Sequence, residues 1–191
     1  RVDFYRGSLD DVLDRFYRTA SFHGATHIVR LTGDCPLTDS GLIDQMIATH
    51  IDHDNDYTSN TLQPSYPDGL DVEVFRFTCL AQAWREARLP SEREHVTPFL
   101  YRHPERFRLE NISAVSDLSC HRWTVDEPED FEFVRCVYEA LYPTAPDFGT
   151  SDVLALLERQ PELATINACH KRNEGLSLSL AADDHFTRSE P

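Results

Sequence analysis

Residues 27–34 read His-Ile-Val-Arg-Leu-Thr-Gly-Asp, and residues 122–126 read Arg-Trp-Thr-Val-Asp. Each stretch places an aspartate directly after a short apolar segment of the kind that forms a buried β-strand. Strand-like and helix-like segments alternate along the rest of the chain, which indicates an α/β layer fold. Because the carboxyl ends of neighbouring parallel strands border one crevice, we expect Asp34 and Asp126 to meet there.

Local sequence signals predict where the elements begin and end. Apolar periodicity and capping residues predict helices starting near Ser8, Asp39 or Ser40, Phe77, Ser91 (with Glu94 closing a capping box), Pro128 and Thr150. Strands are predicted over 2–5, 28–31, 57–60, 71–75, 107–112 and 122–125, with 71–75 half exposed because polar and apolar residues alternate in it. We expect one domain over residues 1–180 and a disordered tail over 181–191.

The composition disfavours several kinds of partner. The formal net charge is −15, with 33 Asp and Glu against 18 Lys and Arg, which argues against a nucleic-acid partner. No apolar run approaches the ~20 residues that cross a bilayer, so we expect no membrane partner. Five scattered cysteines without a C-x-x-C pair favour free thiols in a reducing compartment, and hence a cytoplasmic protein. The chain starts on Arg1, and we expect it to begin within the fold.

Two convergent aspartates suit a magnesium ion, which takes one or two carboxylates and completes its octahedron with water and phosphate oxygens. The alternative is that Asp34 and Asp126 each cap a loop or a helix, as aspartates commonly do. Capping explains either residue taken alone, whereas the pair favours a metal. No glycine-rich phosphate loop occurs in the sequence.

Two further segments carry polar side chains in positions from which they could contact a substrate. Residues 66–73 contain Asp68, Asp71 and Glu73, and in an extended chain Asp71 and Glu73 point to one face, where they could accept the hydroxyls of a polyol. The Pro-Asp-Gly in this segment is equally typical of a solvated turn. Residues 91–95 offer Glu94 and His95 at a helix start, either for an anionic or hydroxylic substrate or for local surface ion pairs.

Together these segments resemble the cytidylyltransferase family of spore coat polysaccharide synthesis proteins, which is related to the enzymes that make CMP-activated acidic sugars. The resemblance runs in order through nearly the whole chain. It is carried by residues 6–8 (Arg-Gly-Ser) and 11–15 (Asp-Val-Leu-Asp-Arg), by 30–37, 66–75, 91–98 and 122–126, and by 173–175 (Asn-Glu-Gly) with Ser179.

The resemblance implies a three-layer α/β/α Rossmann-like nucleotide-diphospho-sugar transferase fold. It also implies transfer of a nucleotidyl group, typically CMP from CTP, to a sugar or sugar acid with release of pyrophosphate, within surface polysaccharide biosynthesis. In the family pattern Mg²⁺ would be held by Asp34 and Asp126. The nucleotide would lie near Arg6, Gly7, Ser8 and Gly33, and the acceptor near Arg30, Asn60, Asp68, Gly69, Asp71, Glu73, Glu94 and His95. A homodimer is expected from the same resemblance.

The sequence departs from the family pattern in one respect. The family carries a glycine- and arginine-containing loop after its first strand, which wraps the triphosphate, and this sequence has neither that loop nor the first strands. An alternative is therefore a non-catalytic fragment that binds a sugar nucleotide or a partner subunit. A sugar-transferring enzyme of similar fold is a third possibility, although the strand that leads to Asp34 lacks the D-x-D motif that such an enzyme would need there.

Overall fold

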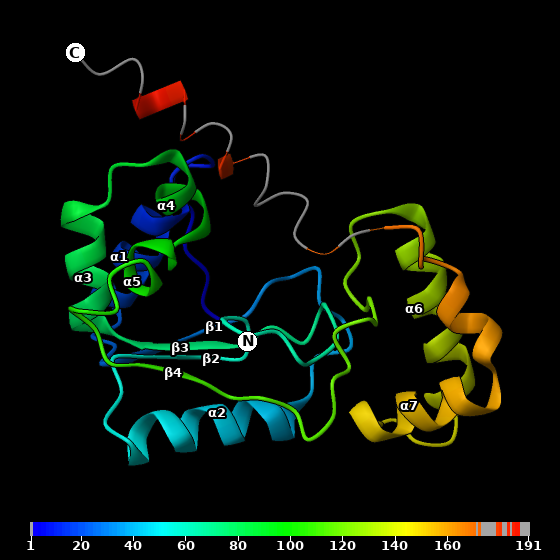
Figure 1. Ribbon diagram of the computed structural model, residues 1–191. Coiled ribbons are helices and arrows are strands. Elements are labelled where there is room, and N and C mark those ends of the chain that lie inside the picture. Colours follow the sequence, from blue (N-terminus) through cyan, green and yellow to red (C-terminus); the bar gives the residue numbers. More distant parts are fainter. Residues whose placement is uncertain (1, 171, 173–178, 181–182, 184, 188–191) are drawn as a thin grey trace.

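Four short strands form one sheet at the centre of the molecule (Figure 1). The computed structural model describes residues 2–170, 172, 179–180, 183 and 185–187. The strands follow the order β1-β3-β2-β4 and comprise β1 (His27–Arg30), β2 (Tyr57–Ser59), β3 (Glu73–Arg76) and β4 (Leu109–Asn111).

The sheet is mixed, so the expectation of a parallel sheet is wrong. β2 and β4 pair in parallel, but β3 is antiparallel to both β1 and β2. A parallel connection needs a crossover, usually a helix, and residues 60–72 between β2 and β3 form none. β3 therefore returns directly alongside β2.

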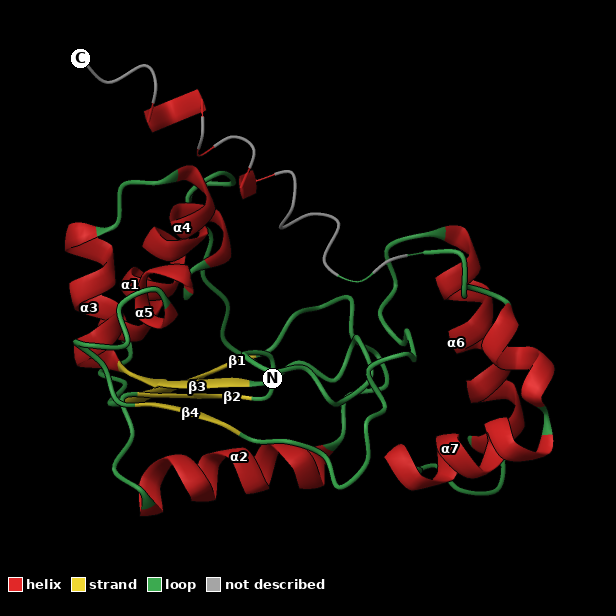
Figure 2. Cartoon of the chain, in the orientation of Figure 1, coloured by secondary structure: helices red, strands yellow, loops and turns green. Residues whose placement is uncertain are grey.

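Helices cover both faces of the sheet, which confirms the expected α/β/α layering (Figure 2). On one face, Val72 and Val74 pack with α2 (Ser40–Asp52). On the other face, Phe75 joins a second apolar cluster with α1 (Val12–Phe22), α3 (Phe77–Glu86) and α5 (Pro98–Tyr101), and α4 (Pro90–His95) lies beside α1. Because both faces are covered, residues 73–75 are buried, and the prediction that this strand is half exposed is wrong.

Helix starts were predicted well where a side chain caps its own helix. Asp39 caps α2, and α6 (Pro128–Leu141) and α7 (Thr150–Arg159) begin at the predicted residues, followed by the short η1 (Pro161–Thr165). Two caps differ from expectation. Asp11 caps α1, with Ser8 Oγ instead accepting a hydrogen bond from Asp11 N. At α4 it is Glu92, not Glu94, that accepts bonds from the preceding backbone amides.

Two predicted strands do not form. Residues 2–5 carry no strand, and residues 122–125 make only one parallel bridge, between Arg122 and Asp68. Trp123 is instead held by packing, because it is buried in the apolar cluster that includes Phe133 and Leu157. β1 is the first strand in the sheet order and alternates between exposed and half-buried residues, rather than being buried as expected.

Of the described residues that follow η1, Ser179 and Asp183 contact α4, through His95 and Ser91 respectively. The expectation of a disordered tail over 181–191 falls largely outside the described residues, as does the Asn-Glu-Gly motif at 173–175. Asp183, which is described, is buried and accepts hydrogen bonds from Ser91 N and Ser91 Oγ at 2.9 and 2.5 Å. None of the described helices is long and apolar enough to cross a bilayer.

Candidate functional site

The loops that carry Asp34 and Asp126 lie side by side. Val125 N donates a hydrogen bond to Asp34 O at 2.8 Å, and Thr124 Oγ1 approaches the same oxygen at 3.4 Å. The two aspartates therefore come from adjoining backbone segments, although one segment follows an edge strand and the other follows no strand. The Asp34 side chain is exposed, with the Cys35 thiol 3.5 Å from Oδ1, and the Asp126 side chain is 52% exposed.

Arg122 joins Asp126 to two other carboxylates. Its Nη2 donates to Asp126 Oδ2 at 2.9 Å and to Asp130 Oδ2 at 2.7 Å, and its Nη1 donates to Asp68 Oδ2 at 3.3 Å. Burial would raise the pKa of Asp130, but hydrogen bonds from Arg122, Asn167 and two backbone amides outweigh it and lower that pKa to about 2. The guanidinium thus fixes one oxygen of Asp126 on the loop beside Asp34.

A second arginine, Arg172, contacts the carboxylates of the segment 68–71. Arg172 Nη2 donates to Asp71 Oδ1 at 2.6 Å, and its Nη1 donates to Tyr66 O at 3.0 Å. Burial raises the pKa of Asp71 to about 6 in spite of this ion pair. Gly69 lies at φ +105°, and a Cβ there would sit 2.5 Å from Thr124 N. Only glycine lets this loop approach the backbone beside Trp123 so closely.

Glu73 and Arg30 form a buried pair on neighbouring strands. Arg30 Nη1 donates to Glu73 Oε2, while Glu73 Oε1 accepts from Tyr57 OH at 2.6 Å and from Thr97 Oγ1 at 2.5 Å. Burial, followed by the nearby Glu73 carboxylate, raises the pKa of Tyr57 well above its usual value. Both Glu73 oxygens are therefore engaged within the protein.

Glu94 and His95 are brought together by Ser179. Ser179 Oγ donates to Glu94 Oε2 at 2.7 Å and lies 2.9 Å from His95 Nε2. Burial lowers the pKa of His95, and the Arg30 guanidinium acts in the same direction. The charges of Arg30 and Glu73 both act on the pKa of His95. Among the described residues, however, no hydrogen bond joins Glu94 or His95 to Arg30 or Glu73.

The remaining predicted site residues, Asn60, Gly33 and 6–8, lie outside these carboxylate clusters. Asn60 is buried, and its side-chain amide binds the backbone of the neighbouring loop. It donates a hydrogen bond to Leu70 O at 2.7 Å and accepts one from Val72 N at 2.9 Å. Gly33 is exposed. Arg6, Gly7 and Ser8 are exposed ahead of α1, where Gly7 packs on Arg15. Among the described residues no hydrogen bond or ion pair joins 6–8 to Asp34 or Asp126.

Sequence reasoning missed the arginines that organise these carboxylates. The sequence places Arg122 in a predicted strand and in the 122–126 segment of the family resemblance, but it assigns no role to Arg122 or to Arg172. The available signal for Arg122 was its place four residues before Asp126 and eight before Asp130, a spacing that one long side chain can bridge at a helix start. Arg172, Thr97 and Ser179 act across large sequence separations and carry no comparable local signal.

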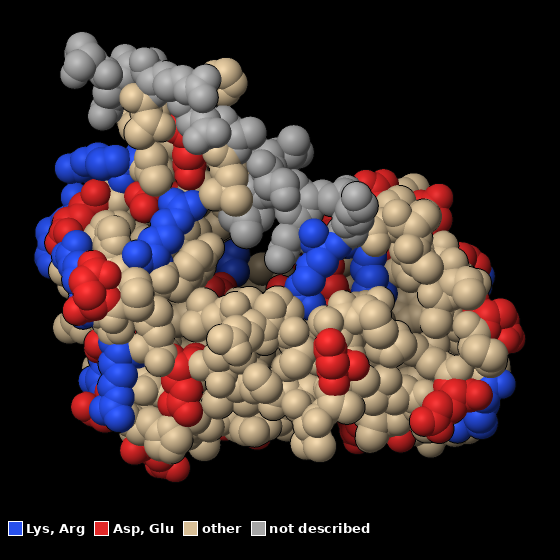
Figure 3. Space-filling view, viewed as in Figure 1, with Lys and Arg blue, Asp and Glu red and all other residues tan. Residues whose placement is uncertain are grey.

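The residues present fit a magnesium ion. Asp34 and Asp126 supply hard carboxylate oxygens on adjoining loops, and both side chains are open to solvent. Within the described part of the chain no cluster of three or more His, Cys, Asp or Glu could hold a metal. Two carboxylates nevertheless match the ligand set that Mg²⁺ takes when water and phosphate complete it. In the space-filling view, acidic and basic side chains meet in a hollow between the helical layer and the α6–α7 side (Figure 3).

Comparisons with known proteins show which family this chain is similar to. The profile of the cytidylyltransferase family matches residues 1–166. The chain is 34% identical over 169 residues to an uncharacterized protein of Methanocaldococcus jannaschii, covering 87% of this chain and 68% of that protein. It is 34% identical over 164 residues to the spore coat polysaccharide biosynthesis protein SpsF of Bacillus subtilis, covering 84% of this chain and 67% of that protein.

A solved structure agrees with both sequence comparisons. The structure of a cytidylyltransferase from Leptospira borgpetersenii serovar Hardjo-bovis superposes with a TM-score of 0.80 at 30% identity, covering 84% of this chain and 67% of that chain. This match confirms the Rossmann-like fold that the motifs implied. The chain therefore belongs to the cytidylyltransferase family of nucleotidyltransferases.

Proposed function

We propose that this protein transfers a cytidylyl group from CTP to a hydroxyl of a sugar or sugar acid, with release of pyrophosphate, in surface polysaccharide biosynthesis. The observation that carries the proposal is the hydrogen bond from Val125 N to Asp34 O, which sets two exposed carboxylates on adjoining loops. The family supports nucleotidyl transfer. The spore coat relative favours a sugar as acceptor.

The reaction is a displacement at the α-phosphorus of the nucleotide. An oxygen of the acceptor forms the new bond to phosphorus, and the bond from phosphorus to the bridging oxygen breaks, so that pyrophosphate leaves with the electron pair. The protein contributes mainly by positioning the two reactants and by stabilising the added negative charge. A magnesium ion held by Asp34 and Asp126 would supply charge neutralisation on the phosphate oxygens.

Asp71 is the carboxylate best suited to receive the acceptor's proton. Its side chain is 29% exposed, and Oδ1 is fixed by Arg172. A carboxylate whose pKa is raised to about 6 is a stronger base than an ordinary aspartate and is still largely ionised at neutral pH. Asp68 lies beside it, between Arg122 and Arg172.

Arg30 and His95 are assigned to the binding of the acceptor. Because both Glu73 oxygens are engaged by Tyr57, Thr97 and Arg30, Glu73 holds the Arg30 guanidinium in place rather than meeting a hydroxyl itself. Asn60 and Gly69 act on the backbone of the 68–72 loop. Arg6, Gly7, Ser8 and Gly33 stay assigned to the nucleotide on the family pattern alone.

The test is pyrophosphate release from each nucleoside triphosphate, with a panel of sugars and sugar acids, with and without magnesium. We expect turnover with CTP that needs magnesium and falls by about 10²-fold or more in Asp34→Asn and in Asp126→Asn. Asp44→Asn, which changes an exposed aspartate on α2, is the matched control and should keep full activity. Circular dichroism verifies that each variant is folded.

Near-normal turnover in both Asp34→Asn and Asp126→Asn would overturn the assignment of the site. Absence of turnover with every nucleotide, together with saturable binding of a sugar nucleotide, would instead support the non-catalytic alternative.

A further inference from the structure

A cavity of about 580 Å³, widely open to solvent, lies among α1, α3 and α4, and it shares no lining residue with the carboxylate site described above. Its walls come from Asp14 on α1, from Trp84 and Arg85 on α3, from Ala87 and Arg88 just after α3, and from Arg93 on α4. Ligand pockets in proteins commonly measure about 300–1,000 Å³, so this cavity can hold a small metabolite.

The carboxylates around this cavity are already neutralised. Arg93 Nη2 donates to Asp11 Oδ2 at 2.5 Å, Arg18 pairs with Asp14 at 2.7 Å, and Arg106 pairs with Glu86 at 2.7 Å. Among the described residues, neither Arg85 nor Arg88 has a hydrogen bond or an ion pair from its guanidinium. In a chain of net charge −15, the cavity therefore carries a local surplus of positive charge.

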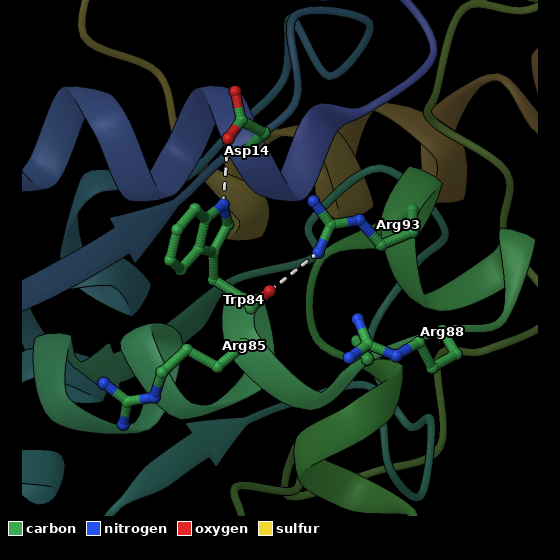
Figure 4. A pocket seen from close by; sticks show the side chains of 6 residues that line it. Asp14, Trp84, Arg85, Arg88 and Arg93 are labelled. Atoms are coloured by element: carbon green, nitrogen blue, oxygen red, sulfur yellow. Dashed lines mark hydrogen bonds between the residues drawn. The ribbon is translucent and has the colours of Figure 1, made fainter.

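The cavity walls are also held in place before any ligand arrives. The Trp84 ring stacks on Tyr17 with 4.1 Å between ring centroids, and Trp84 Nε1 donates to Asp14 Oδ1 at 2.8 Å. Arg93 Nη1 donates to Trp84 O at 3.0 Å. Figure 4 shows the guanidinium groups of Arg88 and Arg93 both directed towards Trp84, whereas Arg85 extends away from them. Fixed walls lower the entropic cost of binding.

We propose that this cavity is a second binding site, for a small molecule that carries a phosphate group. Guanidinium groups match phosphate oxygens in geometry and charge, so the phosphate would lie between Arg88 and Arg93. Trp84 and Ala87 provide an apolar wall for the remainder of the molecule. Arg85 adds positive charge at the rim. The site depends on none of the residues assigned to nucleotidyl transfer.

The indole N–H signals of the two tryptophans give a direct test by ¹H–¹⁵N NMR, because Trp84 lines the cavity and Trp123 is buried elsewhere. The probes are inorganic phosphate and glycerol 3-phosphate, titrated against sodium chloride at equal ionic strength. We expect a saturable shift of the Trp84 signal with either phosphate probe and none with chloride, while the Trp123 signal stays fixed. The Trp84→Phe variant assigns the two signals.

Variants make the test specific to the cavity. Arg88→Gln should weaken phosphate binding about fivefold or more, which corresponds to about 1 kcal/mol. Arg159→Gln, which removes an exposed arginine on α7, should leave binding unchanged. Tighter binding of glycerol 3-phosphate than of phosphate would support a phosphate ester as the ligand, and equal binding would support the free anion. Equal shifts with chloride, no saturable shift, or equal effects of Arg88→Gln and Arg159→Gln would overturn the proposal.

Discussion

Gly69 carries a constraint that no other residue type can meet. It combines φ +105° with a backbone contact that leaves a Cβ only 2.5 Å from Thr124 N. We expect Gly69→Ala to lower the free energy of unfolding by roughly 3 kcal/mol, because strain and overlap add. Gly24→Ala is the matched control, since Gly24 has φ +63° but open space at its Cβ position. It should cost only about 1 kcal/mol.

Urea unfolding followed by circular dichroism measures both glycine variants. Equal destabilisation by Gly69→Ala and Gly24→Ala would show that the close approach to Thr124 does not matter.

Arg122 balances three carboxylates, one of which, Asp130, has a fully buried side chain. We expect Arg122→Gln to cost about 3–5 kcal/mol of unfolding free energy, because it leaves the buried Asp130 charge without its partner. The control is Arg135→Gln, which breaks exposed ion pairs on α6 and should cost less than about 1 kcal/mol. Chemical denaturation measures both, and similar losses in the two variants would contradict this role for Arg122.

At the scale of elements, Asp39 ties two helices together. Its Oδ1 accepts from Leu42 N at 3.1 Å in the first turn of α2, and its Oδ2 accepts from Thr150 N at 3.0 Å and Thr150 Oγ1 at 2.6 Å at the start of α7. We expect Asp39→Ala to destabilise the protein by about 2 kcal/mol, more than loss of a cap alone. A double-mutant cycle with Thr150→Ala should give a coupling of about 1 kcal/mol. Additive effects of the two substitutions would rule out the link between α2 and α7.

Elements governed by local chemistry were predictable from the sequence. Asp39 accepts a hydrogen bond from Leu42 N in the first turn of α2, and Asp130 and Asp152 accept bonds from the backbone amides just ahead of α6 and α7. The structure has these helices starting at the predicted residues. The 122–125 strand was predicted wrongly, because Trp123 and Val125 are apolar for packing against the α6–α7 side rather than for pairing in a sheet. The burial of β3 also depended on distant helices that cover both faces.

The candidate site was predictable to a similar degree. The sequence predicts that Asp34 and Asp126 meet at the ends of parallel strands. The structure places their backbone segments side by side, but no pair of parallel strand ends brings them there. The partners of Asp71 and Glu94 could not be read from spacing, because Arg172 reaches Asp71, and Ser179 reaches Glu94, from far along the chain. Such contacts are set by tertiary structure and leave no periodic trace.

At the scale of the whole molecule, two buried groups give opposite dependences of stability on pH. His50 is fully buried beside Thr58, and burial lowers its pKa to about 4. The unfolded chain therefore binds a proton that the folded chain does not, and stability falls by about 3 kcal/mol as pH falls from 6.5 to 4. The pKa of Asp71 is raised to about 6, so here the folded chain binds a proton that the unfolded chain does not. This effect lowers stability by a similar amount, about 3 kcal/mol, as pH rises from 4 to 6.

Variants separate these two contributions. Between pH 4.5 and 6, we expect the unfolding free energy of Asp71→Asn to rise with pH more steeply than that of the parent, and that of His50→Gln to rise less steeply or to fall. His23→Gln, which replaces an exposed histidine, should run parallel to the parent. Denaturant melts at closely spaced pH values provide the slopes, and parallel curves for all four proteins would refute both assignments.

The proposal that Asp34 and Asp126 share one cation is tested most directly by binding of Mn²⁺, a spectroscopic substitute for magnesium. Electron paramagnetic resonance in the presence of CTP measures this binding. We predict one bound ion per parent chain, with affinity reduced roughly tenfold or more in both Asp34→Asn and Asp126→Asn. Asp44→Asn should bind as the parent does. Parental affinity in either Asp34→Asn or Asp126→Asn would contradict a shared metal site.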